Sequence, residues 1–328
     1  MFERFPPIDP YETGTMVTDD GHQIYWECCG KPDGRPVVFL HGGPGAGSSP
    51  GSRRYFDPEL YRAVIFDQRG CGRSRPLASD PDADLSSNTT AHLVGDIEQL
   101  RQLLGIDFWT VVGVSWGTAL ALAYVQAHPE RVLALLLALV GVGSRREVAW
   151  VTQGVGRIFP REWERFASVL PQPPAGSWDD SPVDLPAAYG DLLFDPDPDV
   201  REHAAREWCA WEDAHVSLAP GWQHNPWFDD PEFRMQFARL VTHYWRNGHF
   251  LEDEQLIRDA PSLNGIPGIL IHGRYDVSGP LETALRLSRR WTSSELVIID
   301  QGHGGDDEFP RAIIDGLDRL ATRPRHPN

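Results

Sequence analysis

Positive charge is scarce in this sequence, and lysine is almost absent from it. Its 328 residues include 30 Lys and Arg against 47 Asp and Glu, a net charge of −17, and Lys31 is the single lysine. Clustered basic side chains carry binding to nucleic-acid backbones and to anionic membrane surfaces. The charge balance therefore argues against both kinds of partner, and we expect neither nucleic acid nor membrane to be bound.

Cysteine is also scarce, and its spacing argues against two common uses. The four cysteines are Cys28, Cys29, Cys71 and Cys209, and none of them forms a CxxC pair. A disulfide framework is read from several spaced cysteines in a small secreted chain, and a structural zinc site needs closely paired ligands. We therefore expect no disulfide framework, no metal and no cofactor.

Long apolar stretches are missing as well. The longest run, residues 132–143, is far shorter than the roughly 20 residues that a membrane-spanning helix needs. The first residues lack the basic region and apolar stretch of a signal peptide. With 41% hydrophobic and 23% charged residues, the composition is typical of a globular protein, and we expect a cytoplasmic location.

Short apolar runs, each followed by a glycine-rich turn, recur along the chain and are typical of buried parallel strands. They cover residues 22–28, 37–40, 61–66, 110–114, 133–139, 268–271 and 296–299. Helical spacing of apolar residues follows at residues 90–104, 119–127, 281–291 and 308–320. This alternation predicts an α/β fold with a mostly parallel, doubly wound sheet that binds ligands at the carboxyl ends of its strands.

The alternation stops between residues 142 and 262. This segment is rich in Trp, Pro and Asp, and residues 171–199 read as a surface loop with short helical turns. Helix-like stretches cover residues 146–157, 199–213 and 231–246. We therefore expect a catalytic core of residues 1–141 and 263–328, with residues 142–262 inserted as a helical cap domain over the active-site end.

A candidate nucleophile lies in Gly113-Val-Ser115-Trp-Gly117, which matches the pattern GxSxG. The match follows a β-branched run and opens a helical stretch, which is the setting of a nucleophile elbow. Its glycines allow a tight strand-to-helix turn that leaves the serine oxygen exposed. A serine that only caps a helix would give the same pattern, but the residues further along the chain favour a nucleophile at Ser115.

A serine hydroxyl needs a base, and the base needs an orienting acid. In this architecture the three follow the chain order serine, acid, histidine. Asp276 and His303 each follow a predicted strand, so both lie at the sheet edge that carries Ser115. Asp300 and Asp306 are rival acids because both are close to His303 in sequence.

The oxyanion of the reaction needs preorganised N–H donors. The first candidate is the N–H of Trp116, one residue past the nucleophile. The second is the N–H of Gly43, in the glycine-rich loop at residues 41–45, with Gly42 as the alternative. Residues 67–74 are expected to brace this loop.

Short motifs spread over nearly the whole chain carry a family resemblance. They are Pro6-Pro-Ile-Asp-Pro-Tyr11, Gly21-His-Gln-Ile-Tyr-Trp-Glu27, His41-Gly-Gly-Pro-Gly45, Asp67-Gln-Arg-Gly-Cys-Gly-Arg-Ser74, Ser115-Trp-Gly117, Trp208-Cys-Ala-Trp-Glu212, His243-Tyr244 with Asn247-Gly248, Gly273-Arg-Tyr-Asp276 and Gly302-His303. In these motifs the sequence resembles the proline iminopeptidases, serine aminopeptidases with the α/β-hydrolase fold. The resemblance implies Ser115, Asp276 and His303 as the triad and Gly43 and Trp116 as oxyanion donors.

The resemblance also implies a carboxylate that holds the free α-amine of the substrate. That role falls to Glu212, for which a solvated glutamate on a cap helix is the alternative. A carboxylate facing an ammonium makes a charge-assisted hydrogen bond and rejects substrates that lack the amine. We therefore expect a small-molecule or short-peptide substrate with a free N-terminal amine, and a monomer or small homo-oligomer.

Several pocket positions depart from the family pattern. The family's second amine-binding Glu falls at Val241, its pocket Phe falls at Gly141, and its Cys after the triad Asp falls at Gly279. These changes predict a larger, less polar pocket, in which Gly42, Gly141, Val241 and Trp150 join Glu212 as substrate contacts.

Neighbouring residues could refill the altered pocket. Asp213, Glu207 or another acid of the cap could replace the missing carboxylate, and Trp150, Trp211, Trp227 or Trp245 could supply apolar walls.

We therefore predict a serine aminopeptidase that releases N-terminal proline or a small residue such as alanine through an acyl-enzyme. The altered pocket suggests removal of an aminoacyl protecting group from a large apolar amine in natural-product biosynthesis. An esterase, lactonase or amidase of the same fold, which needs no free amine, is the alternative.

Overall fold

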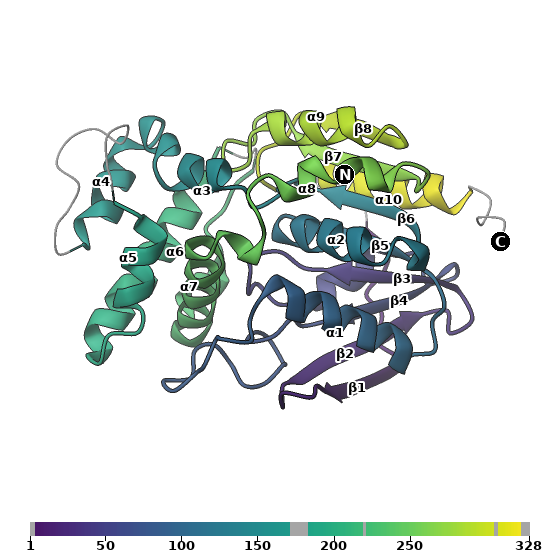
Figure 1. Cartoon of the computed structure of the whole chain (residues 1–328), viewed down its shortest axis with the longest axis horizontal. Coiled ribbons are helices and arrows are strands. Elements are labelled where there is room, and N and C mark those ends of the chain that lie inside the picture. The colour runs from purple at the N-terminus through teal and green to yellow at the C-terminus, as the bar shows by residue number, and fades with distance from the viewer. Residues whose placement is uncertain (1–3, 171–182, 219–220, 305–307, 323–328) are drawn as a thin grey trace.

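The computed structural model describes residues 4–170, 183–218, 221–304 and 308–322. Among them, an eight-stranded sheet has the order β1-β2-β4-β3-β5-β6-β7-β8 (Figure 1). The strands are β1 (Glu12–Val17), β2 (Gln23–Gly30), β3 (Arg35–Leu40), β4 (Tyr61–Phe66), β5 (Trp109–Val114), β6 (Val132–Ala138), β7 (Gly268–Gly273) and β8 (Ser294–Ile299). From β4 to β8 across the sheet all pairings are parallel, so the predicted mostly parallel sheet is confirmed.

The other edge of the sheet differs from the prediction. Strand β2, expected to be parallel, pairs antiparallel with both β1 and β4. Strand β1 was not predicted, because its sequence Glu-Thr-Gly-Thr-Met-Val contains no apolar run and buries only Met16. An edge strand with one solvated face needs few apolar residues, and a short connection makes the chain turn straight back into β2.

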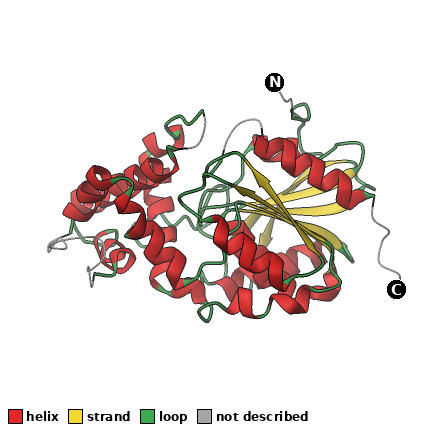
Figure 2. Cartoon of the chain, turned by 90° about the horizontal axis from the view of Figure 1, so that it is seen from above, coloured by secondary structure: helices red, strands yellow, loops and turns green. Residues whose placement is uncertain are grey.

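Helices cover both faces of the sheet (Figure 2). On one face lie α1 (Thr90–Leu103), α2 (Trp116–Ala127) and α9 (Leu281–Arg290), and on the other lies α10 (Glu308–Ala321). These are the helices that the apolar spacing predicted, and the doubly wound architecture is confirmed.

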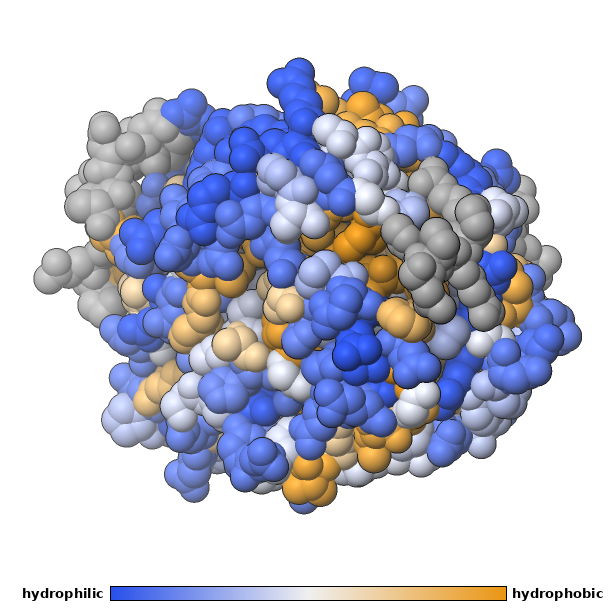
Figure 3. Space-filling model, turned by 45° about the vertical axis from the view of Figure 1, so that its right-hand side comes forward, coloured by the Kyte–Doolittle hydropathy of each residue, from blue (hydrophilic) through white to orange (hydrophobic). Residues whose placement is uncertain are grey.

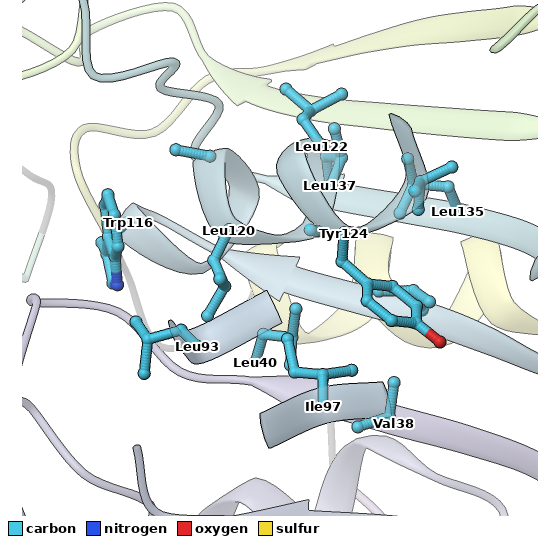
Figure 4. Packing of buried hydrophobic residues seen from close by; sticks show 14 of the residues in the cluster. Val38, Leu40, Leu93, Ile97, Trp116, Leu120, Leu122, Tyr124, Leu135 and Leu137 are labelled. Carbon is cyan, nitrogen blue, oxygen red and sulfur yellow. The ribbon is translucent and has the colours of Figure 1, made fainter. Parts of the chain in front are cut away.

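Helix α2 lies at the centre of the larger hydrophobic cluster (Figure 4). Its Leu120 and Tyr124 are fully buried and pack with Leu93 and Ile97 of α1 and with Val38 of β3. Complete burial of such a side chain contributes about 1.5–3 kcal/mol. The helix that follows the predicted nucleophile is therefore anchored along its whole length.

Helices fill the segment between β6 and β7. They are α3 (Arg145–Thr152), α4 (Pro160–Ser168), α5 (Leu185–Leu192), α6 (Pro198–Val216), α7 (Pro231–Arg246) and α8 (Gln255–Arg258). Helices α3 to α7 are called the cap below, and Figure 1 shows them beside the sheet. The short 3-10 helices of the chain are η1 (Pro50–Tyr55), η2 (Pro129–Arg131), η3 (Gly154–Arg157), η4 (Pro226–Asp229), η5 (Gly248–Phe250) and η6 (Ala260–Leu263).

The cap has a hydrophobic cluster of its own, with Trp163, Phe166, Tyr189, Trp208 and Trp211 at its centre. Helix α4 was not predicted, and α5 lies where a surface loop with only short turns was expected. The rest of that loop, residues 171–182, lies outside the described residues. Helix α4 is short and rich in polar residues, and α5 is short and contains Pro186 and Gly190, so neither helix has a long apolar pattern that the sequence could reveal.

Polar side chains of α7 connect the cap to the core. The buried Gln236 side chain donates from Nε2 to the carbonyl of Gly45 at 2.9 Å. The buried Arg239 guanidinium donates to the carbonyls of Ala78 and Asp80 at 2.9 and 2.7 Å. These bonds join α7 to two loops of the core.

The end of the inserted segment packs against the core helices. Leu256 and Ile257 of α8 and Leu263 of η6 lie in the same hydrophobic cluster as α1 and α2, and Leu240 and Tyr244 of α7 also belong to it.

The molecular face in Figure 3 is mostly hydrophilic, with apolar side chains in scattered patches. Among the residues with described positions, no helix combines the length and the apolar character that a membrane crossing requires.

Candidate active site

Ser115 lies between the end of β5 and the first residue of α2. Its backbone has φ 54° and ψ −124°, a conformation that non-glycine residues rarely adopt outside strained functional turns. A Cβ on Gly113 would approach the carbonyl oxygen of Gly117 to 2.3 Å, and one on Gly117 would approach that of Leu40 to 2.1 Å. Both flanking glycines are thus required by close backbone approach, and the turn holds the serine side chain above the sheet edge.

The structure brings Ser115, His303 and Asp276 together. Ser115 Oγ lies 3.1 Å from His303 Nε2, and His303 Nδ1 lies 2.8 Å from Asp276 Oδ2. The three residues follow β5, β8 and β7, whose carboxyl ends meet at one edge of the sheet. If Nδ1–H donates to the carboxylate, Nε2 is left as the acceptor of the serine proton, as a general base requires.

The charges of this group favour an ion pair. Burial opposes the charged form of Asp276, but His303, His272 and the N–H of Gly279, which donates to Oδ1 at 2.9 Å, outweigh it and lower the pKa of Asp276. Burial also opposes protonation of His303, but the Asp276 carboxylate outweighs it, and the pKa of His303 is raised.

The rival acids do not take this position. Asp300 is largely exposed and pairs with Arg274 at 2.9 Å. Asp306 lies outside the described residues.

The loop of residues 41–45 follows β3 and approaches the nucleophile. Gly43 has φ +113°, a region that glycine adopts without strain, and it lines the same pocket as Ser115 and Trp116. A Cβ on Gly42 would come within 3.1 Å of the Ser115 Cβ. Gly42 therefore packs behind the serine and is not among the residues that line the pocket.

Gln68 ties this loop to the elbow. Its side-chain nitrogen donates to the carbonyl of His41 at 3.0 Å, and its Oε1 accepts from Trp116 Nε1 at 3.0 Å. Its backbone N–H donates to His41 Nε2 at 3.1 Å. The predicted bracing of the loop by residues 67–74 is confirmed by these bonds.

A pocket of about 130 Å³ opens at Ser115, between the core and the cap. The core contributes Gly43, Ser115, Trp116, Ala119, Leu139, Val140, Gly141, Gly143, Ser278, Gly279, His303 and, from η5, His249. The cap contributes Glu147, Val148, Val151, Glu212, His215 and Trp245. The pocket is thus mainly apolar, with a few polar groups on the cap side and at the triad.

Glu212 lines this pocket from α6. Its side chain is 15% exposed, Oε1 accepts from Trp208 Nε1 at 3.1 Å, and Oε2 lies 3.1 Å from His215 Nε2. His215 in turn contacts Ser278 Oγ at 2.7 Å. The carboxylate is therefore held in place in a residue that lines the same pocket as Ser115.

Two residues predicted to contact the substrate lie elsewhere. Val241 is fully buried in the hydrophobic cluster of the cap, because its face of α7 packs against α6, and Trp245 one turn later reaches the pocket instead. Trp150 is not among the lining residues, since its Nε1 donates to the carbonyl of Val277 at 2.7 Å and holds α3 to the loop after Asp276. Gly141 does line the pocket.

The other suggested tryptophans have structural positions. Trp211 is buried and donates to the carbonyl of Val151 at 3.1 Å, whereas Trp227 is 57% exposed. Of the tryptophans proposed as walls, Trp245 alone lines the pocket.

Neither acid suggested as a replacement reaches the pocket. Asp213 bonds His224 and the N–H of Asn225, and Glu207 pairs with Arg165 at 2.6 Å.

The second carboxylate in the lining is Glu147, which the sequence analysis did not single out. It accepts from the N–H and hydroxyl of Ser144 at 2.9 and 3.0 Å, from the N–H of Val142 at 3.2 Å and from the Thr283 hydroxyl at 3.0 Å. Burial raises its pKa. The pattern Ser-x-x-Glu at the start of α3 is a capping box and could have located this residue.

Metal ligation has no counterpart in the site. Within the part of the chain that the structure describes, no three His, Cys, Asp or Glu side chains group closely enough to hold a metal ion.

A family model for the α/β hydrolase fold matches residues 35–308. A protein of Streptomyces coelicolor named "Probable proline iminopeptidase" is 50% identical over 322 residues, which cover 97% of each chain. The proline iminopeptidase of Arabidopsis thaliana is 42% identical and covers 92% of this chain and 78% of its own length.

Among solved structures, the crystal structure of a proline iminopeptidase of Mycobacterium smegmatis is similar in fold. It has a TM-score of 0.63 at 20% identity and covers 94% of this chain and 99% of its own. This last likeness concerns the fold alone.

Proposed function

Since the chain belongs to the proline iminopeptidase family of α/β-hydrolase serine peptidases, we propose that it hydrolyses the amide bond after one small N-terminal residue, proline or alanine, with a free amine. One observation carries this proposal: the Glu212 carboxylate and the Ser115 hydroxyl line the same small pocket.

The proposed reaction proceeds through an acyl-enzyme. Ser115 Oγ attacks the acyl carbonyl carbon while His303 Nε2 takes its proton, and Asp276 stabilises the imidazolium. The N–H groups of Gly43 and Trp116 receive the negative charge on the former carbonyl oxygen. His303 then gives the proton to the departing amine. A water molecule attacks the acyl-enzyme in the same way, with His303 taking its proton, and this step releases the amino acid and frees Ser115.

Glu212 is proposed as the anchor of the substrate's ammonium. The family's second carboxylate position is Val241, which is buried in the cap. Glu147 reaches the pocket, but its oxygens already accept from Val142, Ser144 and Thr283. A carboxylate with these donors already bound has little capacity left for an ammonium, so Glu212 is left to carry the recognition of the free amine.

The pocket size supports a compact acyl residue. A cavity of about 150 Å³ in another protein admits benzene, and the pocket here measures about 130 Å³. A pyrrolidine ring or a methyl group fits such a space.

The leaving amine is proposed to be large and apolar, as in the removal of an aminoacyl protecting group in natural-product biosynthesis. A Cβ added to Gly141 or Gly279 would have no neighbour closer than 3.8 Å, so the wall at these glycines leaves room.

The test compares kcat/KM for prolyl anilide, alanyl anilide and an alanyl amide of a bulky apolar amine, with Ser115→Ala as the control. We expect Ser115-dependent cleavage of the free-amine substrates and none of their N-acetyl versions. Faster cleavage of the bulky amide supports the proposed leaving group, and fastest cleavage of prolyl anilide contradicts it. Cleavage of only N-acylated or ester substrates would refute the aminopeptidase and establish the esterase alternative.

A further inference from the structure

One buried histidine of the pocket has no part in the mechanism above. His249 lies in η5, with 3% of its surface exposed, and its backbone has φ 56° and ψ 17°. This left-handed conformation is uncommon outside glycine and costs strain in a residue with a Cβ. Strained residues persist where the surrounding structure fixes them, and they cluster at functional sites.

The imidazole of His249 is packed between the oxyanion elbow and the chain leading to the cap. It stacks on the Trp116 indole, with ring centroids 5.1 Å apart and an interplanar angle of 25°. Its backbone carbonyl accepts from the Thr90 hydroxyl at 2.5 Å. The stack orients the ring and the Thr90 bond holds the backbone, and His249 lines the pocket together with Ser115 and Trp116.

Gly143 provides the space that the ring occupies. A Cβ at position 143 would come within 2.7 Å of the His249 ring. The imidazole therefore fits here because position 143 has no side chain. Because the imidazole fills the space against this part of the wall, it limits how far the pocket extends.

The chemistry of the ring suits a wall rather than a charged ligand. Burial lowers the pKa of His249 to about 4, partly offset by the Gly143 backbone, so the ring is neutral at neutral pH. No described group makes a hydrogen bond of ordinary geometry to its Nδ1. A flat, neutral ring contributes shape and contact to the pocket.

We infer that His249 is a specificity-determining residue, whose imidazole closes the acyl pocket and limits the N-terminal residue to a compact side chain. The inference rests on the proposed function in one respect, that the group bound in this pocket is the acyl part of the substrate. Replacing the ring by hydrogen opens the pocket toward Gly143 and admits leucyl and phenylalanyl groups.

The test uses His249→Gly and His249→Asn with alanyl, leucyl and phenylalanyl p-nitroanilides. Glycine removes the ring and suits the left-handed backbone, and asparagine tolerates that backbone while keeping a smaller polar side chain. We expect the phenylalanyl-to-alanyl ratio of kcat/KM to rise at least about tenfold in His249→Gly, since one methylene in an apolar pocket discriminates by about 10- to 200-fold. His249→Asn should give a smaller rise.

Glu254→Gly is the matched control. Glu254 is also a non-glycine residue with a left-handed backbone, at φ 60°, but it pairs with Arg286 away from the pocket. Relief of strain alone would change both glycine variants alike, whereas the inference requires that the ratio change only at His249. An unchanged ratio in both folded His249 variants overturns the inference, as does an equal change in Glu254→Gly.

A ladder of p-nitrophenyl esters from acetate to hexanoate separates this inference from the proposed function. These esters place an acyl chain at Ser115 without needing an amine. If the wild-type protein cleaves no aminoacyl anilide, the proposed function fails, and a hexanoate-to-acetate ratio that rises in His249→Gly still supports the wall. If anilides are cleaved and neither ratio moves, the proposed function stands and the inference about His249 is refuted. Where His249→Gly does not fold, His249→Asn decides.

Discussion

Replacement of Glu212 by glutamine provides the sharpest test of how the free amine is recognised. The glutamine side chain would keep the shape of the glutamate and could still accept from Trp208 Nε1, which donates to Glu212 Oε1 at 3.1 Å. It would lose the negative charge, and the position of Oε2, 3.1 Å from His215 Nε2, would become an amide NH2. We therefore expect the pocket to stay intact while the attraction for an ammonium disappears.

The size of the effect follows from the burial of the carboxylate. Glu212 is 15% exposed, so solvent screens its interaction with an ammonium only in part. A hydrogen bond to a charged group contributes about 1.5–3 kcal/mol, and about 1.4 kcal/mol corresponds to tenfold in rate. We expect kcat/KM for free-amine anilides to fall about 10- to 150-fold.

The assay compares alanyl anilide with p-nitrophenyl acetate in the wild-type protein and in Glu212→Gln. The ester has no ammonium, so its kcat/KM should stay within a few-fold of the wild-type value. Glu207→Gln is the control, because Glu207 lies on the same helix but pairs with Arg165 outside the pocket. Equal losses on the anilide and the ester, or no loss on the anilide, would refute the reasoning.

Two further predictions concern the triad and the elbow. Burial opposes protonation of His303, but Asp276 and then Glu212 outweigh it and raise the pKa of His303. Since the base must be neutral, kcat/KM should fall as the pH drops through a value above the ordinary histidine pKa of about 6.5. A pH profile whose acid limb lies below that value would contradict this prediction. In Glu212→Gln the acid limb should move to lower pH. Gly117→Ala should destabilise the protein by about 1–3 kcal/mol by overpacking, because the new Cβ would lie 2.1 Å from the carbonyl oxygen of Leu40. Urea unfolding measures this change, and an unchanged midpoint would count against the tight elbow.

The strands that precede Ser115, Asp276 and His303 could be predicted from sequence because each is an apolar run followed by a glycine-rich turn. Ser115, Asp276 and His303 follow such runs, and parallel strands bring their carboxyl ends to one edge regardless of the sequence between them. Strand β1 could not be found in this way, since an exposed edge strand needs no apolar run. The direction of β2 depends on the short connection from β1, which composition does not specify.

The cap side of the pocket was harder to predict. Whether Val241 or Trp245 faces the substrate depends on how α7 rotates against α6, and a helix with apolar residues on two sides does not determine that rotation. His249 gave no signal, because an isolated histidine in a turn reveals neither its left-handed backbone nor its stacking partner. Glu147 was recognisable as a capping residue, but its place at the pocket comes from tertiary packing.

The bond from Gln236 of α7 to the carbonyl of Gly45 has a mechanical consequence. Gly45 ends the same short loop that carries the Gly43 N–H, so this loop is fastened to the cap as well as to the core. If the cap swings away to admit a large amine or release a product, it must either break this bond or drag the loop with it. Movement of the cap and the alignment of the proposed oxyanion donor at Gly43 are therefore coupled through this one hydrogen bond.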